Sequence, residues 1–167
     1  MTIGESILPE YDHEMSTTRR TLERLPDDKF TWKPHEKSMT LGRLASHVAE
    51  FPQWAIVTLQ TETLELDPQQ KGYLAASTAE LLEKFDKDVV EARQALASIS
   101  DEEMFKLWTL KMAGKSVFEM PRVGCLRSMV MNHMIHHRGQ LGVFLRLLDV
   151  PVPGAYGPSA DDKTTFA

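Results

Sequence analysis

Hydrophobic positions recur at steps of three and four residues over four long stretches of this chain, and that period is typical of amphipathic helices. The first stretch covers about Ile3 to Leu25 and ends at Pro26. The second begins near Thr40, a residue type that favours the N-cap position of a helix. The third opens at Ser77, and Glu80 three residues later completes the pattern of a capping box.

The fourth stretch predicts a last helix from about Arg122 to Leu148, because the prolines that follow prevent its continuation. Residues 107–120, which precede it, favour either a short β-hairpin or an irregular excursion. Residues 151–167 form a loop-rich tail with many Gly, Pro and Asp residues. Four helices with little strand signal predict an all-α fold, a four-helix bundle, in a single domain over residues 1–167.

Composition and charge exclude several classes of function. The chain has 167 residues, of which 42% are hydrophobic, with a formal net charge of -5 and no cluster of Lys and Arg. Nucleic-acid binding needs concentrated positive charge, so we expect no nucleic-acid partner. Cys125 is the one cysteine, which rules out an internal disulfide and a cysteine-based zinc site. The sequence has no recognisable signal peptide and no membrane-length apolar run, so we expect a cytoplasmic protein without a membrane partner.

The last helix carries a histidine pair at a spacing that suits metal binding. His133 and His137 are four residues apart, so they lie about 40° apart on one face of a helix. His137 falls near the middle of the apolar stripe of this helix, His133 falls to one side of it, and His136 falls near its rim. Two imidazoles at this spacing can hold one metal ion, which predicts His133 and His137 as ligands.

His47 is the natural third ligand, because it lies on the flank of the apolar stripe of the second helix. Three histidines would leave coordination positions for water or substrate, as catalytic zinc sites do. Buried imidazoles need polar partners, which a metal ion would supply. The competing interpretation is that these histidines are ordinary core residues held by hydrogen bonds.

Several segments resemble the DinB/YfiT-like metalloprotein family. They are LASHVAEFPQW around His47, HMIHHRGQLGVFLR from His133 onward, WKP at residues 32–34, and VPVPGAYGPS at residues 150–159. The resemblance spans most of the chain, and the HxxxHRGQ segment is its most specific part. At position 50 this chain has Glu50, where some relatives have a further histidine; it is either a base or a solvated helix residue.

This resemblance implies a bundle of DinB/YfiT type with metal ligands at His47, His133 and His137. It implies nickel or zinc as the metal ion, and a homodimer. Characterised relatives include transferases and isomerases that use a small-molecule thiol as cosubstrate. It therefore implies a metal-dependent thiol S-transferase. A metal-dependent hydrolase is a close second interpretation, because a metal with an open position can also activate water.

Two residues near the histidine pair are candidates for supporting roles. Gln140 could orient a ligand or a metal-bound water, and Arg138 could hold a substrate carboxylate, although a salt bridge is the competing role for Arg138. Gly139 and Gly142 weaken a helix interior, which predicts close approach of another helix or subunit. Two alternatives stay open. The protein could be a non-catalytic, stress-linked metal-binding protein, or a dimeric bundle with a vestigial metal site.

Overall fold

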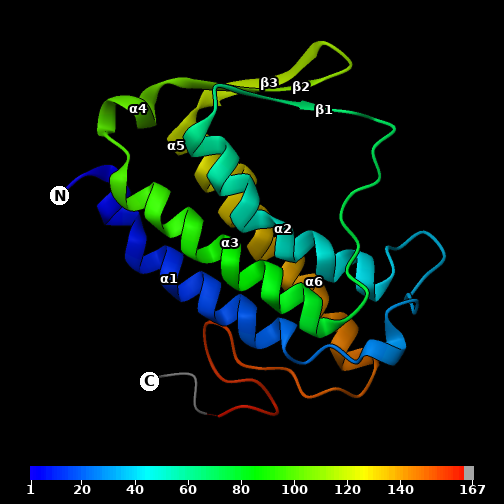
Figure 1. The fold of residues 1–167 in the computed structure, drawn as a ribbon. Coiled ribbons are helices and arrows are strands. Elements are labelled where there is room, and N and C mark those ends of the chain that lie inside the picture. Colours follow the sequence, from blue (N-terminus) through cyan, green and yellow to red (C-terminus); the bar gives the residue numbers. More distant parts are fainter. Residues whose placement is uncertain (164–167) are drawn as a thin grey trace.

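The computed structural model describes residues 1–163 and consists mainly of helices that run side by side (Figure 1). The long helices are α1 (Ile3–Leu22), α2 (Leu41–Gln60), α3 (Thr78–Ser98) and a continuous helical rod made of α5 (Arg122–Cys125), the π-helical segment η2 (Leu126–Asn132) and α6 (His133–Leu147). Short helical turns are η1 (Asp27–Lys29) and α4 (Asp101–Phe105). No helix within residues 1–163 is long and apolar enough to cross a membrane.

Capping side chains begin the helices where the sequence predicts them. The Thr40 hydroxyl accepts a hydrogen bond from the backbone N–H of Arg43 at 3.2 Å, which fixes the start of α2. The Ser77 hydroxyl accepts from the backbone N–H of Glu80 at 3.2 Å at the start of α3. Each cap satisfies a backbone donor that has no partner inside its helix.

A small sheet corrects the prediction of a purely α-helical fold. Its strands are β1 (Thr63–Leu66), β2 (Leu107–Met112) and β3 (Lys115–Pro121), in the order β1-β2-β3. The hairpin alternative for residues 107–120 is confirmed, since β2 and β3 pair antiparallel. Ala113 and Gly114 have φ values of 49° and 74° in the tight turn between them. Strand β1 was not predicted, and it pairs with β2 in parallel.

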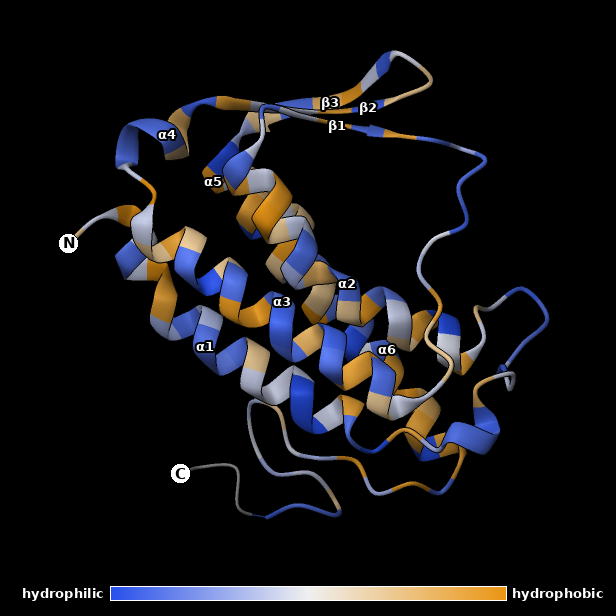
Figure 2. Ribbon diagram, viewed as in Figure 1, coloured by the Kyte–Doolittle hydropathy of each residue, from blue (hydrophilic) through white to orange (hydrophobic). Residues whose placement is uncertain are grey.

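The apolar faces of the helices meet in one main core, and a smaller cluster lies below the sheet. Figure 2 shows that the helices carry both hydrophobic and hydrophilic positions along their length. The smaller cluster consists of Trp108, Leu110 and Cys125. The Cys125 thiol is buried, and burial raises its pKa, which disfavours the reactive thiolate form.

The rod that ends in α6 contains a π-helical segment that the sequence did not predict. Buried residues in and directly before this segment form two pairs five positions apart, Cys125 at the end of α5 with Val130, and Leu126 with Met131. This spacing matches the wider turn of a π-helix, whose hydrogen bonds join residues five apart. The segment ends directly before His133, so it sets the rotation at which α6 presents its histidines.

The C-terminal tail folds back against α1 and α6. An Arg20 guanidinium nitrogen donates to the backbone carbonyl of Gly154 at 3.1 Å, and Arg146 forms an ion pair with Asp161 at 2.5 Å. Figure 1 shows the tail running back beside α1. The predicted tail extends to Ala167, but its last part lies outside the described residues.

Candidate metal centre

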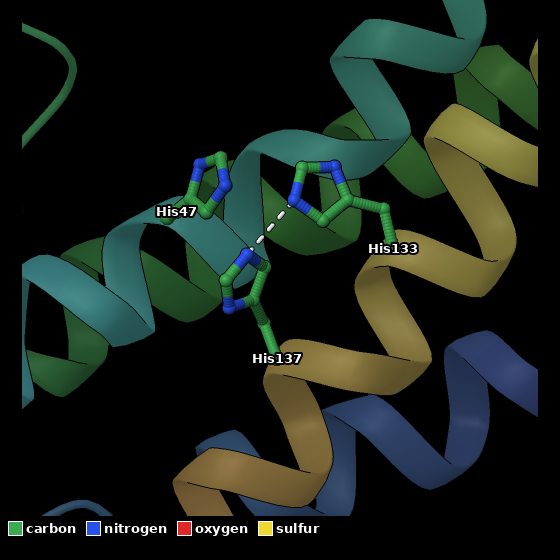
Figure 3. Close-up of side chains that lie close together, drawn as sticks. All are labelled: His47, His133 and His137. Atoms are coloured by element: carbon green, nitrogen blue, oxygen red, sulfur yellow. Dashed lines mark hydrogen bonds between the residues drawn. The ribbon is translucent and has the colours of Figure 1, made fainter.

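Helices α2 and α6 bring three histidine side chains together, His47 from α2 and His133 and His137 from α6 (Figure 3). Their potential ligand atoms all lie within 4.8 Å of one another. The ring centroid of His47 is 5.4 Å from that of His133 and 4.8 Å from that of His137. Figure 3 shows one nitrogen of each ring facing the space that the three rings share.

An aromatic ring borders this space on the protein side. Phe51 follows His47 by one helical turn on α2 and is buried. Its ring centroid is 4.9 Å from those of both His47 and His133. A low-dielectric wall on this side strengthens electrostatic interactions inside the cluster.

The hydrogen bonds of the α6 pair leave a lone pair of His137 facing its neighbour. Nδ1 of His137 lies 2.7 Å from the side-chain oxygen of Gln140 and donates to it. A neutral imidazole has only one N–H, so Nε2 of this His137 ring is a lone-pair acceptor. It lies 2.9 Å from Nε2 of His133. A neutral His133 ring can donate its N–H across this contact, and a metal ion can replace that proton by accepting a lone pair from each ring.

An extra proton is disfavoured in this environment. Burial lowers the pKa of both His133 and His137, and the neighbouring histidines lower it further, although the Met129 and Gln140 contacts oppose this shift. Neutral imidazoles are the form that binds metal ions. The donor set of three neutral nitrogens therefore fits zinc, nickel or another divalent ion of similar preference.

His47 has a charged neighbour, Glu50, whose role as a base or as a solvated residue the sequence left open. Oε2 of Glu50 lies 3.9 Å from Nδ1 of His47 and 3.5 Å from the Arg43 guanidinium. Burial raises the pKa of Glu50, but the contacts with His47 and Arg43 outweigh this effect, and the net pKa is lowered. Glu50 is therefore an ionised residue facing His47, where it can orient the imidazole as carboxylates do behind metal-binding histidines.

The structure separates the two predicted supporting residues. Gln140 contacts His137 directly, as described above. Arg138 is buried against α1 instead, where its guanidinium forms an ion pair with Glu14 at 2.7 Å and donates to the Tyr156 hydroxyl at 2.9 Å. Of the two roles considered for Arg138, the structure shows the interhelical salt bridge, and the residue is not a supporting neighbour of the histidine cluster. His136 is exposed, as predicted.

A cavity of about 690 Å³ opens beside His47, between α2, β1 and the chain that follows β1. Its walls include Arg43, Glu50, Trp54 and Tyr73. Sequence reasoning missed this cavity because half of its wall comes from an unpredicted strand and from the connection that follows it, whose path depends on that strand. The available signal was the spacing of Arg43, His47, Glu50 and Trp54, which places them along one face of α2.

These features define a mostly helical bundle that carries a three-histidine cluster between two of its helices. The chain belongs to the DinB family, whose sequence profile matches residues 4–165.

Comparisons with individual proteins agree with this family. The chain is 25% identical to the uncharacterized protein YrdA of Bacillus subtilis (strain 168) over 162 residues, which cover 97% of this chain and 93% of YrdA. A DinB-like protein from Bacillus cereus ATCC 10987 matches with a TM-score of 0.71 and 26% identity, over 93% of this chain and 98% of that one. The DinB-like protein YjoA of Bacillus subtilis shares the fold, with a TM-score of 0.64, 19% identity, and coverage of 86% and 92%.

Proposed function

We propose that this protein binds one divalent metal ion, zinc or nickel, through His47, His133 and His137. The observation that carries the proposal is the approach of three imidazoles whose potential ligand atoms all lie within 4.8 Å of one another. A divalent cation binds the lone pairs of neutral imidazoles, and the lowered pKa values of His133 and His137 favour their neutral forms.

We further propose that the site catalyses the transfer of a small-molecule thiol to an electrophile. When bound, a divalent ion acts as a Lewis acid that lowers the pKa of a coordinating thiol or water. The chain's own residues prepare for this chemistry. Gln140 holds the His137 ring in place, Phe51 keeps water from one side, and Glu50 faces His47 from the other. Hydrolysis would use the same residues with water as the nucleophile.

The cavity beside His47 supports a catalytic role over a vestigial site. A vestigial site would be filled by apolar side chains, whereas this wall presents an arginine and an ionised carboxylate next to a histidine. These groups can bind or polarise a substrate. A cytoplasmic location would suit the thiol chemistry, because small thiols stay reduced there.

The homodimer remains part of the proposal. Gly139 has open space where a side chain would point, while Gly142 faces Val152 of the tail. Val143 and Leu147 on the same helix are 59% and 58% exposed. A second subunit would cover these apolar side chains. Light scattering at micromolar concentration should give twice the monomer mass, and a monomer would contradict it.

Metal content tests the central proposal. Tag-free protein, purified without nickel columns and loaded with zinc, should contain about one metal ion per chain by elemental analysis. The His133→Ala/His137→Ala double variant should lose it. His136→Ala is the matched control, because it removes an exposed imidazole from the same helix and should retain the metal. Absence of metal from the parent after loading would refute the proposal.

Cobalt substitution separates thiol chemistry from mere metal binding. The d–d absorption of the cobalt-loaded protein should change when cysteine or another small thiol is added, because a thiolate entering the coordination sphere alters the ligand field. If no small thiol perturbs the spectrum while the metal stays bound, the transferase proposal fails and the metal-binding proposal stands.

A further inference from the structure

The cavity beside His47 has two chemically different ends, arranged along one face of α2. Arg43, His47, Glu50, Trp54 and Val57 all line it, at steps of four, three, four and three residues. Such steps place side chains in a row along a helix. His47 therefore lies between a charged end at Arg43 and an apolar end at Trp54 and Val57.

The cavity is close to neutral in a chain that is negative as a whole. Three cationic side chains, Arg43, Lys71 and Lys84, line it, against two carboxylates, Glu50 and Asp67. Lys84 is paired with the buried Asp88 at 2.5 Å. Since the chain as a whole has a net charge of -5, an anionic group meets less repulsion in this cavity than over the surface in general.

Arg43 retains donors for such a group. Its contacts with Glu50 and with the backbone carbonyl of Tyr73 both come from Nη1, at 3.5 and 3.3 Å. Within residues 1–163, Nη2 and Nε have no hydrogen-bond acceptor. The guanidinium packs against Gly72, where any added Cβ would lie 2.6 Å from Nη2. A glycine at this position thus leaves room for the arginine, which can still bind a carboxylate bidentately.

The apolar end lies under the sheet. Trp54 and Val57 of α2 face Leu64 and Leu66 of strand β1, and Met112 closes the end of β2. The first four side chains are only partly buried, so they present apolar surface to the cavity. The volume of about 690 Å³ falls within the range of small-molecule binding sites.

We propose that this cavity selects an organic carboxylate with an apolar, ring-sized body as the substrate of the metal centre. The inference names the substrate class and rests on the proposed function. The carboxylate binds Arg43, and the apolar body binds against Trp54 and the sheet. At about 1.5 Å per residue, Arg43 lies about 6 Å and Trp54 about 10 Å along the helix from His47, in opposite directions, so the two subsites are about 16 Å apart. A ring at the end of a chain of about that length spans both subsites and passes His47, the proposed metal ligand that lines the cavity.

Binding to the metal-free protein tests this selection independently of catalysis. The probes are 8-phenyloctanoate, its uncharged analogue 8-phenyloctanamide, and propionate, measured by calorimetry after removal of metal with a chelator. The phenyl acid should bind at least tenfold more tightly than either analogue, because only it fills both subsites. This comparison uses the unaltered protein and is independent of whether any variant folds.

Variants assign the binding to the two subsites. Arg43→Gln should weaken binding of the phenyl acid about tenfold and leave the amide unchanged. Trp54→Ala should weaken both aromatic probes. Arg93→Gln is the matched control, since it removes an exposed arginine that pairs with Asp12 on α1, outside the cavity, and binding should not change.

Clear results would overturn the inference. Equal binding of the acid and the amide, no binding of the acid at millimolar concentration, or unchanged affinity in Arg43→Gln would each do so. The proposed function fails separately, by loss of metal uptake. If the acid binds but zinc does not, the cavity assignment survives without the metal centre. If zinc binds but the acid does not, the metal centre stands and the cavity assignment is wrong.

Discussion

The proton balance of His133 and His137 is the residue-scale feature on which the site depends. The His137 ring donates its Nδ1–H to Gln140, so its Nε2 keeps a free lone pair. This nitrogen lies 2.9 Å from Nε2 of His133. Partners of this kind fix the tautomer and orientation of metal-binding histidines.

Acid should destabilise the metal-free protein through this pair. Both rings have a pKa lowered from 6.5, mainly by burial, so the unfolded chain binds protons more readily than the folded one. Their contribution to stability is therefore present above pH 6.5 and is lost as the pH falls through the lowered folded-state values. NMR titration of the imidazole C–H signals, assigned with single His→Gln variants, should show both rings titrating below pH 6.5. Titration of either ring at a higher pH would contradict this assignment.

Removal of the Gln140 amide should weaken metal binding without abolishing it. Gln140→Ala frees the His137 ring to rotate, and loss of such outer partners typically costs about 10- to 100-fold in metal affinity. Competition with a zinc-chelating dye measures the change. Gln94→Ala on the exposed side of α3 provides the control. Equal affinities in the two variants would show that Gln140 has no orienting role.

At the scale of elements, the π-helical segment η2 decides which side of α6 faces α2. It lies between α5, which is anchored below the sheet by Cys125, and the histidines of α6. A wider turn changes the rotation of α6 about the axis of the rod relative to α5. Single-turn π segments are often found next to functional sites for this reason.

Insertion of one alanine after Ser128 should disrupt the site. Ser128 is exposed, so the insertion replaces no core side chain. One residue more rotates the flanking parts of the rod by about 100° relative to each other. Zinc affinity should fall at least tenfold in the insertion variant and stay unchanged in Ser128→Ala. An insertion variant that binds zinc like the parent would show that the rotation set by this segment does not position the histidines.

The elements also show where sequence reasoning succeeds and fails. The faces and caps of helices are local properties, so the His133 and His137 pair and the Thr40 cap were predictable. Strand β1 has four residues and pairs with residues some forty positions later, so its pairing could not be deduced from its own pattern. The same limit applies to Arg138. Its place on the helix was predictable, but its partner Glu14 is contributed by α1 at the other end of the chain.

At the scale of the whole molecule, a buried polar cluster fastens the tail to the bundle. Glu14 and Arg138 are each only 4% exposed and form an ion pair at 2.7 Å. The Tyr156 hydroxyl donates to Glu14 at 2.8 Å and accepts from Arg138 at 2.9 Å. Residues from α1, α6 and the tail are thereby joined in one network.

Neutralising Glu14 should destabilise the fold markedly. Glu14→Gln leaves the Arg138 charge buried without a counter-charge, which costs about 3–5 kcal/mol in comparable buried pairs. Urea unfolding followed by circular dichroism measures this loss. The Glu14→Leu/Arg138→Met double variant removes both charges and should be more stable than Glu14→Gln alone. A single variant within about 1 kcal/mol of the parent would show that the pair does not stabilise the fold.

The position of the three histidines along the chain has a consequence for how the protein is made. His47 and His137 are separated by about half of the sequence, including α3 and the whole sheet. A ribosome has therefore synthesised α1, α2 and α3 before the second and third imidazoles exist. A ligand that requires all three cannot assist the early steps of folding. A metal ion held by all three histidines can therefore bind only after synthesis has passed residue 137 and the first and last halves of the chain have docked.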